Sequence, residues 1–334
     1  MTETNQKRLF VIDTDAGIDD AQAIFMALAA NDVTVLAITT VQGNTSSDQV
    51  AKNVLRVLKV ANRLDIPVYK GCDRTILGRK SVDSGYHGSD GFGDCLDDEP
   101  PSEEIIKKEH ALDVLIKLSC DYKDEITLVC LGPLSNIAAV LQRDPSFGKI
   151  LHDMSQSDYQ LVISRLRYNI LIIHNFGWNH MSSEYNFHCD PEAASAVLEN
   201  LKTPITLVGW ELCEDNGFPW SWYEDFRKIN SEKIKFVTRL ENFAIQKHYL
   251  PRLEKGLAMN YEFADQILVA CVINPSVVRE SRIVYAAVET AGEITRGQVV
   301  IDWKNQLSKK QNVKIITKID RDGVADILIR SLCN

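Results

Sequence analysis

The sequence predicts an α/β protein with a mainly parallel central sheet and helices on both faces. Short apolar runs such as LFVI, TVLAITTV and ITLVCLG alternate along the chain with amphipathic helical patterns. Runs that are apolar at nearly every position are typical of strands buried on both faces, which occur in parallel sheets. The alternation of strands with helices favours the same fold class.

We expect one large open domain spanning residues 1–334, because no repeat and no linker rich in Pro, Ser or Gly divides the chain. The expected strands, in chain order, are Leu9–Thr14, Thr34–Val41, Pro67–Gly71, Ile126–Gly132, Asn169–Asn175, Ile205–Trp210, Ile283–Glu289 and Val313–Ile319. The expected helices are Asp20–Ala30, Ser47–Ala61, Ala111–Ser119, Leu134–Leu141, Glu192–Leu198, Phe263–Ile273 and Gly323–Leu332.

The composition excludes several classes of protein. The chain has 37 Lys and Arg against 46 Asp and Glu, a formal net charge of −9, and no basic stripe that would bind nucleic acid. No apolar run reaches the roughly 18 residues of a membrane span. The polar N-terminus lacks a signal-peptide core, so we expect a cytoplasmic protein. The eight cysteines are scattered without a CxxC pair, which favours reduced thiols over zinc ligands or disulfides.

The first expected strand runs into an acidic turn, in which Asp13, Asp15, Asp19 and Asp20 fall within eight residues. So many carboxylates beside a buried strand repel one another. A helix start would explain Asp19 as N-cap and Asp20 in the first turn, but not the other two. A hard divalent cation such as Ca²⁺, which prefers carboxylate oxygens, would relieve this repulsion. We expect Gly17 to supply the sharp turn that folds the acids together.

The motif DTDAGIDDA resembles the DTDPGIDDA signature of the inosine–uridine-preferring nucleoside hydrolase family, with Ala16 where Pro is usual. Further blocks match the family in the correct order over nearly the whole chain, and HGSDGFGD and NFHCDPEAA are most similar to animal-type members. These blocks are VQGN (Val41–Asn44), HGSDGFGD (His87–Asp94), LGPLSNIA (Leu131–Ala138), EYNFHCDPEAA (Glu184–Ala194) and ADQILVACVINPSVV (Ala264–Val278). The resemblance implies the Rossmann-like nucleoside hydrolase fold.

The resemblance also implies a calcium-dependent enzyme that hydrolyses the N-glycosidic bond of ribonucleosides to free base and ribose. The implied calcium ligands are Asp15, Asp20, Asp265 and the main-chain carbonyl oxygen of Leu131. The metal would hold one water and lower its pKa, and Asp15 would accept the proton as general base. Attack on the anomeric carbon would pass through an oxocarbenium-like state, which suits a site dense in negative charge. Similar proteins are homodimers or homotetramers.

Further site residues are implied in the same way, each with a structural alternative. As alternatives, Asn44 could be a turn residue, Asp265 could be a helix cap and His87 could be an exposed loop residue. Asp190-Pro191-Glu192 is interpreted as a helix start. The implied assignments are Asp19 and Asn186 for the 2′- and 3′-hydroxyls, Asn44 for Asp15 and the sugar, Glu184 and Asn179 for the 5′-hydroxyl, His87 as a catalytic residue and Asp13 as a support for the ligands.

The chain departs from the family pattern in two places. Ala264 stands where some members carry a His associated with protonating the leaving base, so that role would fall to His87, to another residue or to the base itself. Residues 150–183 form an atypical segment: SQSDYQLVISRLRYN intervenes, and LIIHNFGWN lacks the usual Met-Gly-Gly. This segment is an insertion, a mis-spliced stretch or a real divergence.

The atypical segment motivates an alternative function, a catalytically impaired pseudoenzyme of the same fold that binds a nucleoside or sugar. The retained Asp15, Asp20 and Asp265 favour the enzyme, because an abandoned metal site should lose carboxylates. An aspartate-nucleophile phosphatase also opens with an apolar strand followed by Asp-x-Asp. Gly17 and the Asp19-Asp20 pair argue against that class.

Overall fold

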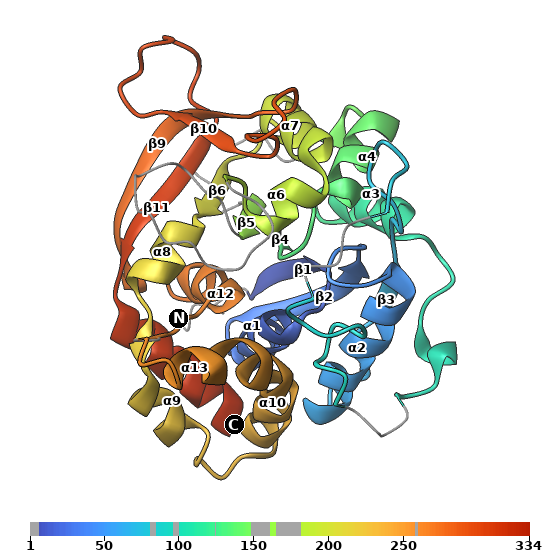
Figure 1. Ribbon diagram of the computed structural model, residues 1–334. Helices are drawn as coiled ribbons and strands as arrows, with labels where there is room; N and C mark the ends of the chain where they lie inside the picture. The colour runs from blue at the N-terminus through green and yellow to red at the C-terminus, as the bar shows by residue number, and fades with distance from the viewer. Residues whose placement is uncertain are drawn as a thin grey trace, which may run out of the picture.

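The computed structural model describes residues 7–80, 85–95, 100–123, 125–147, 161–164, 182–257 and 260–334. Within these residues the chain forms a nine-stranded sheet, in the order β10-β9-β11-β6-β5-β4-β1-β2-β3, and a two-stranded sheet of β7 and β8 (Figure 1). The strands of the large sheet are β1 Arg8–Thr14, β2 Val33–Thr40, β3 Val68–Lys70, β4 Ile126–Cys130, β5 Leu161–Ser164, β6 Ile205–Val208, β9 Val278–Val288, β10 Val299–Asp302 and β11 Val313–Ile319; those of the small sheet are β7 Phe218–Pro219 and β8 Asn260–Tyr261.

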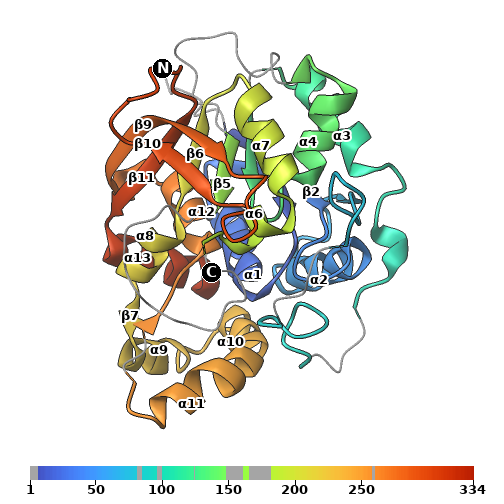
Figure 2. The ribbon, with the colours of Figure 1, turned by 45° about the horizontal axis from the view of Figure 1, so that its top comes forward.

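Helices cover both faces of the large sheet (Figures 1 and 2). The α-helices are α1 Ile18–Ala29, α2 Ser47–Val60, α3 Ala111–Asp121, α4 Ser135–Arg143, α6 Tyr185–Cys189, α7 Pro191–Asn200, α8 Trp210–Asp215, α9 Trp220–Phe226, α10 Glu232–Ala244, α11 Leu250–Leu253, α12 Asp265–Ile273 and α13 Arg321–Cys333. Shorter turns are the 3₁₀ segments η1 Glu103–Ile105 and η3 Pro275–Val277 and the π-helical turn η2 Ile245–Tyr249.

The strand directions confirm the expected fold class. From β11 to β3 every neighbouring pair in the sheet is parallel. β9 pairs in the antiparallel sense with both β10 and β11. Successive residues of β1 belong to different cores: Phe10 and Ile12 pack on the side of α1 and α12, whereas Val11 packs on the side of α4 and α7. This burial on both faces explains why the strand sequences are apolar at nearly every position.

The sheet includes part of the segment that departs from the family pattern. β5, Leu161–Ser164, pairs in parallel with β4 on one side and with β6 on the other. Four residues of the atypical segment therefore form a central strand of the sheet. The strand expected at Asn169–Asn175, and the rest of residues 150–183 up to residue 181, lie outside the described residues.

The sequence analysis gave no elements for the region from α8 to β8. The structure fills it with short helices and the small sheet, packed around aromatic side chains such as Trp222, Phe226 and Tyr261. In Figure 2, α9, α10 and α11 lie together at one end of the molecule. None of the helices that the structure describes is both long and apolar enough to cross a membrane.

Candidate active site

The carboxyl ends of three neighbouring strands bring the family motifs together. β1 pairs in register with β2 at Thr14 and Thr40, and with β4 at Asp13 and Cys130. The segments that follow these strands are the acidic turn, VQGN and LGPLSNIA, and they leave the sheet at the same edge. In open parallel sheets this edge is the usual place for a binding site.

The acidic turn is built differently from the expected one. The residue with positive φ is Ala16, at φ 26°, whereas Gly17 has φ −84° and is the N-cap of α1. The left-handed backbone that was expected at Gly17 is thus found at Ala16. In the structural alternative, Asp19 as N-cap is wrong, because both Asp19 and Asp20 lie in the first turn of α1. Gly17 is instead required by close contact: a Cβ there would lie 2.6 Å from Nδ2 of Asn44 and 2.8 Å from Cε1 of His87. The glycine lets these side chains approach the start of α1.

Three carboxylates meet above this turn. One oxygen each from Asp19, Asp20 and Asp265 lies within 4.8 Å of the others, an arrangement that could hold a metal ion. Asp20 and Asp265 are buried, and Asp19 is 15% exposed. α1 and α12 pack against each other, and their first turns carry these acids. The structure thus joins two of the expected metal ligands and adds Asp19, which was expected to bind a sugar hydroxyl.

The electrostatics of Asp20 fit a cation at this place. Burial raises the pKa of the Asp20 carboxyl, and the negative charges of Asp265 and Asp15 raise it further. Hydrogen bonds from the Thr14 hydroxyl (2.5 Å) and the Gly17 amide (2.9 Å) oppose that rise. A divalent cation would relieve the repulsion between the carboxylates, so the donor set suits a hard metal ion.

Asp15 lies against the loop that follows β2. Its Oδ2 accepts a hydrogen bond of 3.0 Å from the amide of Asn44. Two glycines make room for the carboxylate: a Cβ on Gly43 would stand 2.0 Å from Oδ2, and one on Gly132 would stand 3.0 Å from Oδ1. Asp15 is not one of the three clustered carboxylates, although Asp20 senses its charge. The Asp15 carboxylate therefore lies next to the cluster, in a space that Gly43 and Gly132 leave open.

Asp13 lies behind Asp15 and is fully buried. Its Oδ1 accepts hydrogen bonds from the Thr39 hydroxyl (2.5 Å) and from Nδ2 of Asn136 (2.7 Å). Burial raises the pKa of Asp13 to about 7, against the lowering effect of these two donors. The sequence analysis missed Asn136, although its motif LGPLSNIA was recognised. Asn136 also contacts the Thr40 carbonyl and the Cys72 amide, so it ties three strand ends together.

The short helix α6 carries the residues expected to bind the sugar. Glu184 is its N-cap and accepts hydrogen bonds from the amides of Asn186 (2.7 Å) and Phe187 (3.2 Å). Nδ2 of Asn186 donates to the carbonyl oxygen of Leu131 at 2.7 Å. The Oδ1 atoms of Asn186 and Asn44 are buried and have no hydrogen-bond partner in the described part of the chain, so they are available to donors on a ligand.

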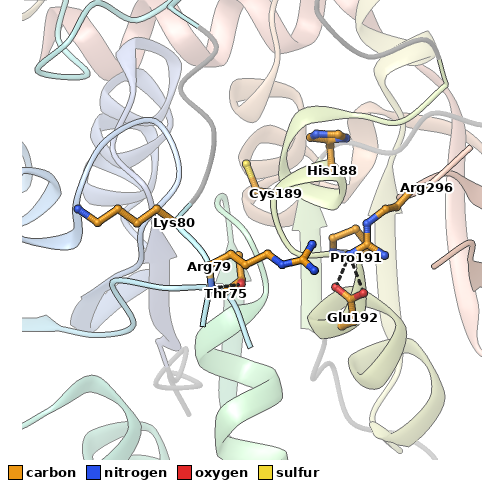
Figure 3. Close-up of a pocket in the computed structure, with 8 residues that line it drawn as sticks. All are labelled: Thr75, Arg79, Lys80, His188, Cys189, Pro191, Glu192 and Arg296. Carbon is orange, nitrogen blue, oxygen red and sulfur yellow. Dashed lines mark hydrogen bonds and ion pairs between the residues drawn. The ribbon is translucent and has the colours of Figure 1, made fainter. Parts of the chain in front are cut away.

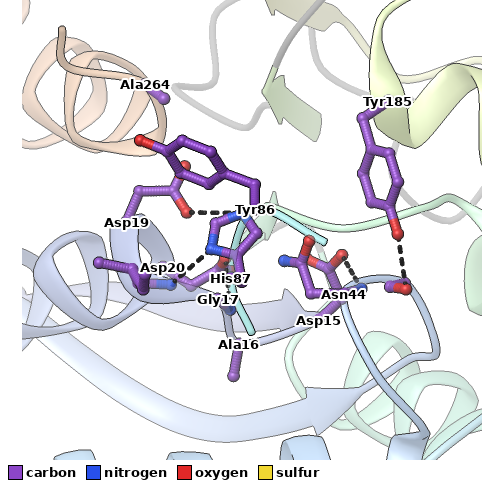
Figure 4. A network of polar contacts seen from close by, with 12 residues as sticks. Asp15, Ala16, Gly17, Asp19, Asp20, Asn44, Tyr86, His87, Tyr185 and Ala264 are labelled. Atoms are coloured by element: carbon purple, nitrogen blue, oxygen red, sulfur yellow. Dashed lines mark hydrogen bonds and ion pairs between the residues drawn. The ribbon is translucent and has the colours of Figure 1, made fainter. Parts of the chain in front are cut away.

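Two more observations concern the sugar side of the site. The hydroxyl of Tyr185, which the sequence analysis missed, donates to the carbonyl of Gly43 at 2.7 Å and so fixes α6 to the loop beside Asp15 (Figure 4). Asn179, expected at the 5′-hydroxyl, lies outside the described residues.

His87 is buried at the start of α1. Its Nδ1 accepts a hydrogen bond of 3.1 Å from the Ile18 amide, and its Nε2 lies 4.0 Å from Oδ1 of Asp19 (Figure 4). Burial lowers the pKa of His87 to about 3, with a smaller contribution from His248. The imidazole is therefore neutral near pH 7, and because Nδ1 accepts, its proton is on Nε2 and faces Asp19.

Comparison with known proteins identifies this arrangement. The family model described as inosine-uridine preferring nucleoside hydrolase matches residues 10–326. The chain belongs to this family. Among curated nucleoside hydrolases it is 27% identical over 322 residues to the pyrimidine-specific ribonucleoside hydrolase RihA of Escherichia coli O81 (strain ED1a), covering 95% of this chain and 96% of the relative.

Solved nucleoside hydrolase structures share the fold. An inosine-guanosine nucleoside hydrolase superposes with a TM-score of 0.84 at 29% identity, covering 98% of both chains. A plant nucleoside hydrolase, PpNRh1, superposes with a TM-score of 0.80 at 27% identity, covering 98% of this chain and 99% of the plant chain. The protein is thus a nucleoside hydrolase, an enzyme that hydrolyses the N-glycosidic bond of ribonucleosides.

Proposed function

We propose that this nucleoside hydrolase uses Ca²⁺ and that Asp15 is the general base of the reaction. The observation that supports this most directly is the cluster of Asp19, Asp20 and Asp265, together with the negative charge of Asp15, which also raises the pKa of the buried Asp20 carboxyl. The proposed ligand set is Asp15, Asp20, Asp265 and the carbonyl oxygen of Leu131. Asp19 adds a fourth carboxylate beside it. Oxygen donors of this kind are those that Ca²⁺ prefers.

The chemistry that Ca²⁺ supplies when bound is a lowered pKa for a coordinated water. Asp15 is placed to accept that proton, because the Asn44 amide and the spaces at Gly43 and Gly132 fix its carboxylate. The negative charges around the sugar stabilise the cationic character of the transition state. In this proposal the neutral Nε2–H of His87 faces Asp19 across 4.0 Å.

The ribose is proposed to lie between the turn after β1 and α6. Asp19 and Asn186 would bind its 2′- and 3′-hydroxyls, with Asn44 beside them. This placement of the ribose is supported by the Oδ1 atoms of both asparagines, which are buried and have no partner among the described residues. They can therefore accept hydrogen bonds from hydroxyl groups. Glu184 and Asn179 would bind the 5′-hydroxyl. A homodimer or homotetramer and a cytoplasmic location stay predictions.

The test is release of free base from a panel of purine and pyrimidine ribonucleosides by the purified full-length protein. We expect activity that is lost after treatment with a calcium chelator and restored by Ca²⁺. Asp15→Asn should lower kcat by at least a thousandfold while the melting temperature stays within a few degrees, because Oδ1 of Asn can still accept the bond from Asn44. Asp48→Asn, an exposed carboxylate paired with Lys70, is the matched control and should change neither quantity.

Two outcomes would contradict the proposal. Full activity of Asp15→Asn would exclude Asp15 as the base. Absence of base release from every nucleoside, by folded protein that binds calcium, would favour the catalytically impaired binding protein instead.

A further inference from the structure

A pocket lies beside the C-terminal end of α6 and the start of α7. It has a volume of about 130 Å³, and its wall includes Arg79, Lys80, His188, Glu192 and Arg296 (Figure 3). Asn186 reaches Leu131 in the active site, whereas His188, two residues further along α6, lines this pocket. α6 therefore contributes side chains to both places. Burial raises the pKa of Cys189, which also lines the pocket, and this thiol is near enough to the active site for the charge of Asp15 to raise its pKa further.

The pocket is basic, although the protein as a whole is acidic. Three permanent cations, Arg79, Lys80 and Arg296, line it against one carboxylate, Glu192. Within the described part of the chain, Glu192 forms its salt bridge with Arg296, through bonds of 2.6 and 2.8 Å. No carboxylate in the described ranges pairs with Arg79 or Lys80. The pocket therefore carries a net positive charge that nothing in those ranges neutralises.

The two arginines come from different parts of the chain. Arg79 belongs to a tight loop closed by the hydrogen bonds from the Thr75 amide to the Arg79 carbonyl (2.8 Å) and from the Arg79 amide to the Thr75 hydroxyl (3.0 Å). Arg296 is fixed by Glu192 and by a bond to the Thr290 carbonyl. Figure 3 shows the guanidinium of Arg79 pointing toward Arg296, while the ammonium group of Lys80 points away.

The same loop is anchored to the start of α7. The Ile76 amide donates to Oδ2 of Asp190, the N-cap of that helix, at 2.7 Å. Pro191 and Glu192, the first residues of α7, line the pocket, so the loop and the helix start form neighbouring parts of its wall. The guanidinium groups of Arg79 and Arg296 therefore face the same space, and an anion between them would reduce their mutual repulsion.

We propose that this pocket binds a phosphate group, either inorganic phosphate or the phosphate of a phosphorylated sugar. Guanidinium groups present paired N–H donors that match the oxygens of a phosphate. The volume corresponds to about four water molecules, enough for one tetrahedral anion. Arg79 is the principal ligand, because its guanidinium is directed into the pocket and has no acidic partner there.

The test is calorimetric titration of the full-length protein with inorganic phosphate. Arg79→Ala should raise the phosphate Kd at least tenfold, and Lys80→Ala, whose charge points away, should raise it less than threefold. Glu192→Gln should lower the Kd, because Arg296 then loses its carboxylate partner. The opposite signs of the Arg79 and Glu192 variants separate binding in this pocket from a general loss of structure.

Two further titrations identify the ligand and exclude the metal site. Ribose 5-phosphate that binds at least tenfold tighter than inorganic phosphate, with the same loss in Arg79→Ala, would assign the phosphorylated sugar; equal affinities would assign phosphate itself. Calcium-loaded, chelator-treated and Asp265→Asn proteins should all bind phosphate equally. No binding at millimolar phosphate, a Kd unchanged in Arg79→Ala, or binding that requires calcium would overturn the proposal, whether or not the protein hydrolyses nucleosides.

Discussion

Nδ2 of Asn186 donates a hydrogen bond of 2.7 Å to the main-chain carbonyl oxygen of Leu131. One side chain thereby joins the helix proposed to bind the sugar to the strand end proposed to bind the metal. A side chain that contacts both the proposed sugar site and the proposed metal site couples the two binding affinities, because moving it changes both sites.

Asn186→Ala should therefore weaken two ligands together. We expect the KM for a ribonucleoside substrate to rise at least tenfold, because the proposed sugar-binding amide is lost. The Kd for calcium should rise severalfold, because Asn186 no longer orients the Leu131 carbonyl oxygen. Steady-state kinetics and calcium titration measure the two effects. Asn200→Ala, which removes an exposed amide bonded to Ala196, is the control. A calcium affinity unchanged in Asn186→Ala would break the proposed link.

Removing one acid of the cluster should have opposite effects with and without calcium. In chelator-treated protein, Asp265→Asn should be more stable than wild type by roughly 1–3 kcal/mol, because repulsion with Asp20 is relieved. Added calcium should raise the melting temperature of wild type and leave that of Asp265→Asn nearly unchanged. Thermal melts with and without calcium measure this. An equal response of both proteins would show that the metal binds elsewhere.

The burial of His87 predicts a stability that depends on pH. Its pKa is about 3 in the folded protein and near 6.5 in the unfolded chain, so the unfolded chain binds a proton that the folded protein does not. The stabilisation is complete above pH 6.5 and is lost as the pH falls from there toward 3. His87→Gln should lose less stability than wild type between pH 7 and 5 in denaturant titrations. Loss of the Ile18 bond should destabilise this variant at pH 7.

A buried carboxylate behind α1 predicts the opposite dependence. Glu241 accepts hydrogen bonds from Gln22 (2.8 Å), Tyr223 (2.9 Å) and Tyr261, and burial raises its pKa to about 7. The folded protein keeps this proton while the unfolded chain releases it near pH 4.5, so stability falls as the pH rises from about 4.5 to 7.

Glu241→Gln should therefore gain stability relative to wild type between pH 5 and pH 8, by at most about 3 kcal/mol. Urea melts at the two pH values measure the difference. Glu232→Gln, on the exposed part of the same helix, α10, is the control and should show no such trend. A difference between Glu241→Gln and wild type that does not change with pH would show that Glu241 keeps an ordinary pKa.

Local patterns predicted the parts of the fold that depend on local sequence. The expected ranges Leu9–Thr14 and Val313–Ile319 agree with β1 and β11 to within one residue, because continuous apolar runs bounded by polar residues define buried strands. The helix expected at Phe263–Ile273 begins at Asp265 instead. Residues 211–261 were assigned no elements. α8, α9 and α11 are short, and contacts between distant aromatic residues such as Trp222 and Tyr261 pack this region. α10 was missed although Ile234, Val237 and Leu240 recur at helical spacing.

The sequence also predicted which residues belong to the site, but it did not predict how they contact one another. Asn136 contacts Asp13 across 123 positions of the chain, and Tyr185 contacts Gly43 across 142, so no local pattern could indicate either bond. The strained backbone at Ala16 is a further example. A residue with φ 26° is uncommon for any side chain, and the sequence pointed to its neighbour Gly17 as the flexible position.

The cluster of Asp19, Asp20 and Asp265 joins the beginning of the chain to its last quarter. During synthesis the ribosome releases α1 long before α12, so a nascent chain carries two of these acids without the third. A cation that needs all three cannot be retained until the C-terminal helices have docked on the sheet. Metal uptake would then mark the completion of folding, and chains that stop before α12 would be left without this stabilisation and open to proteolysis.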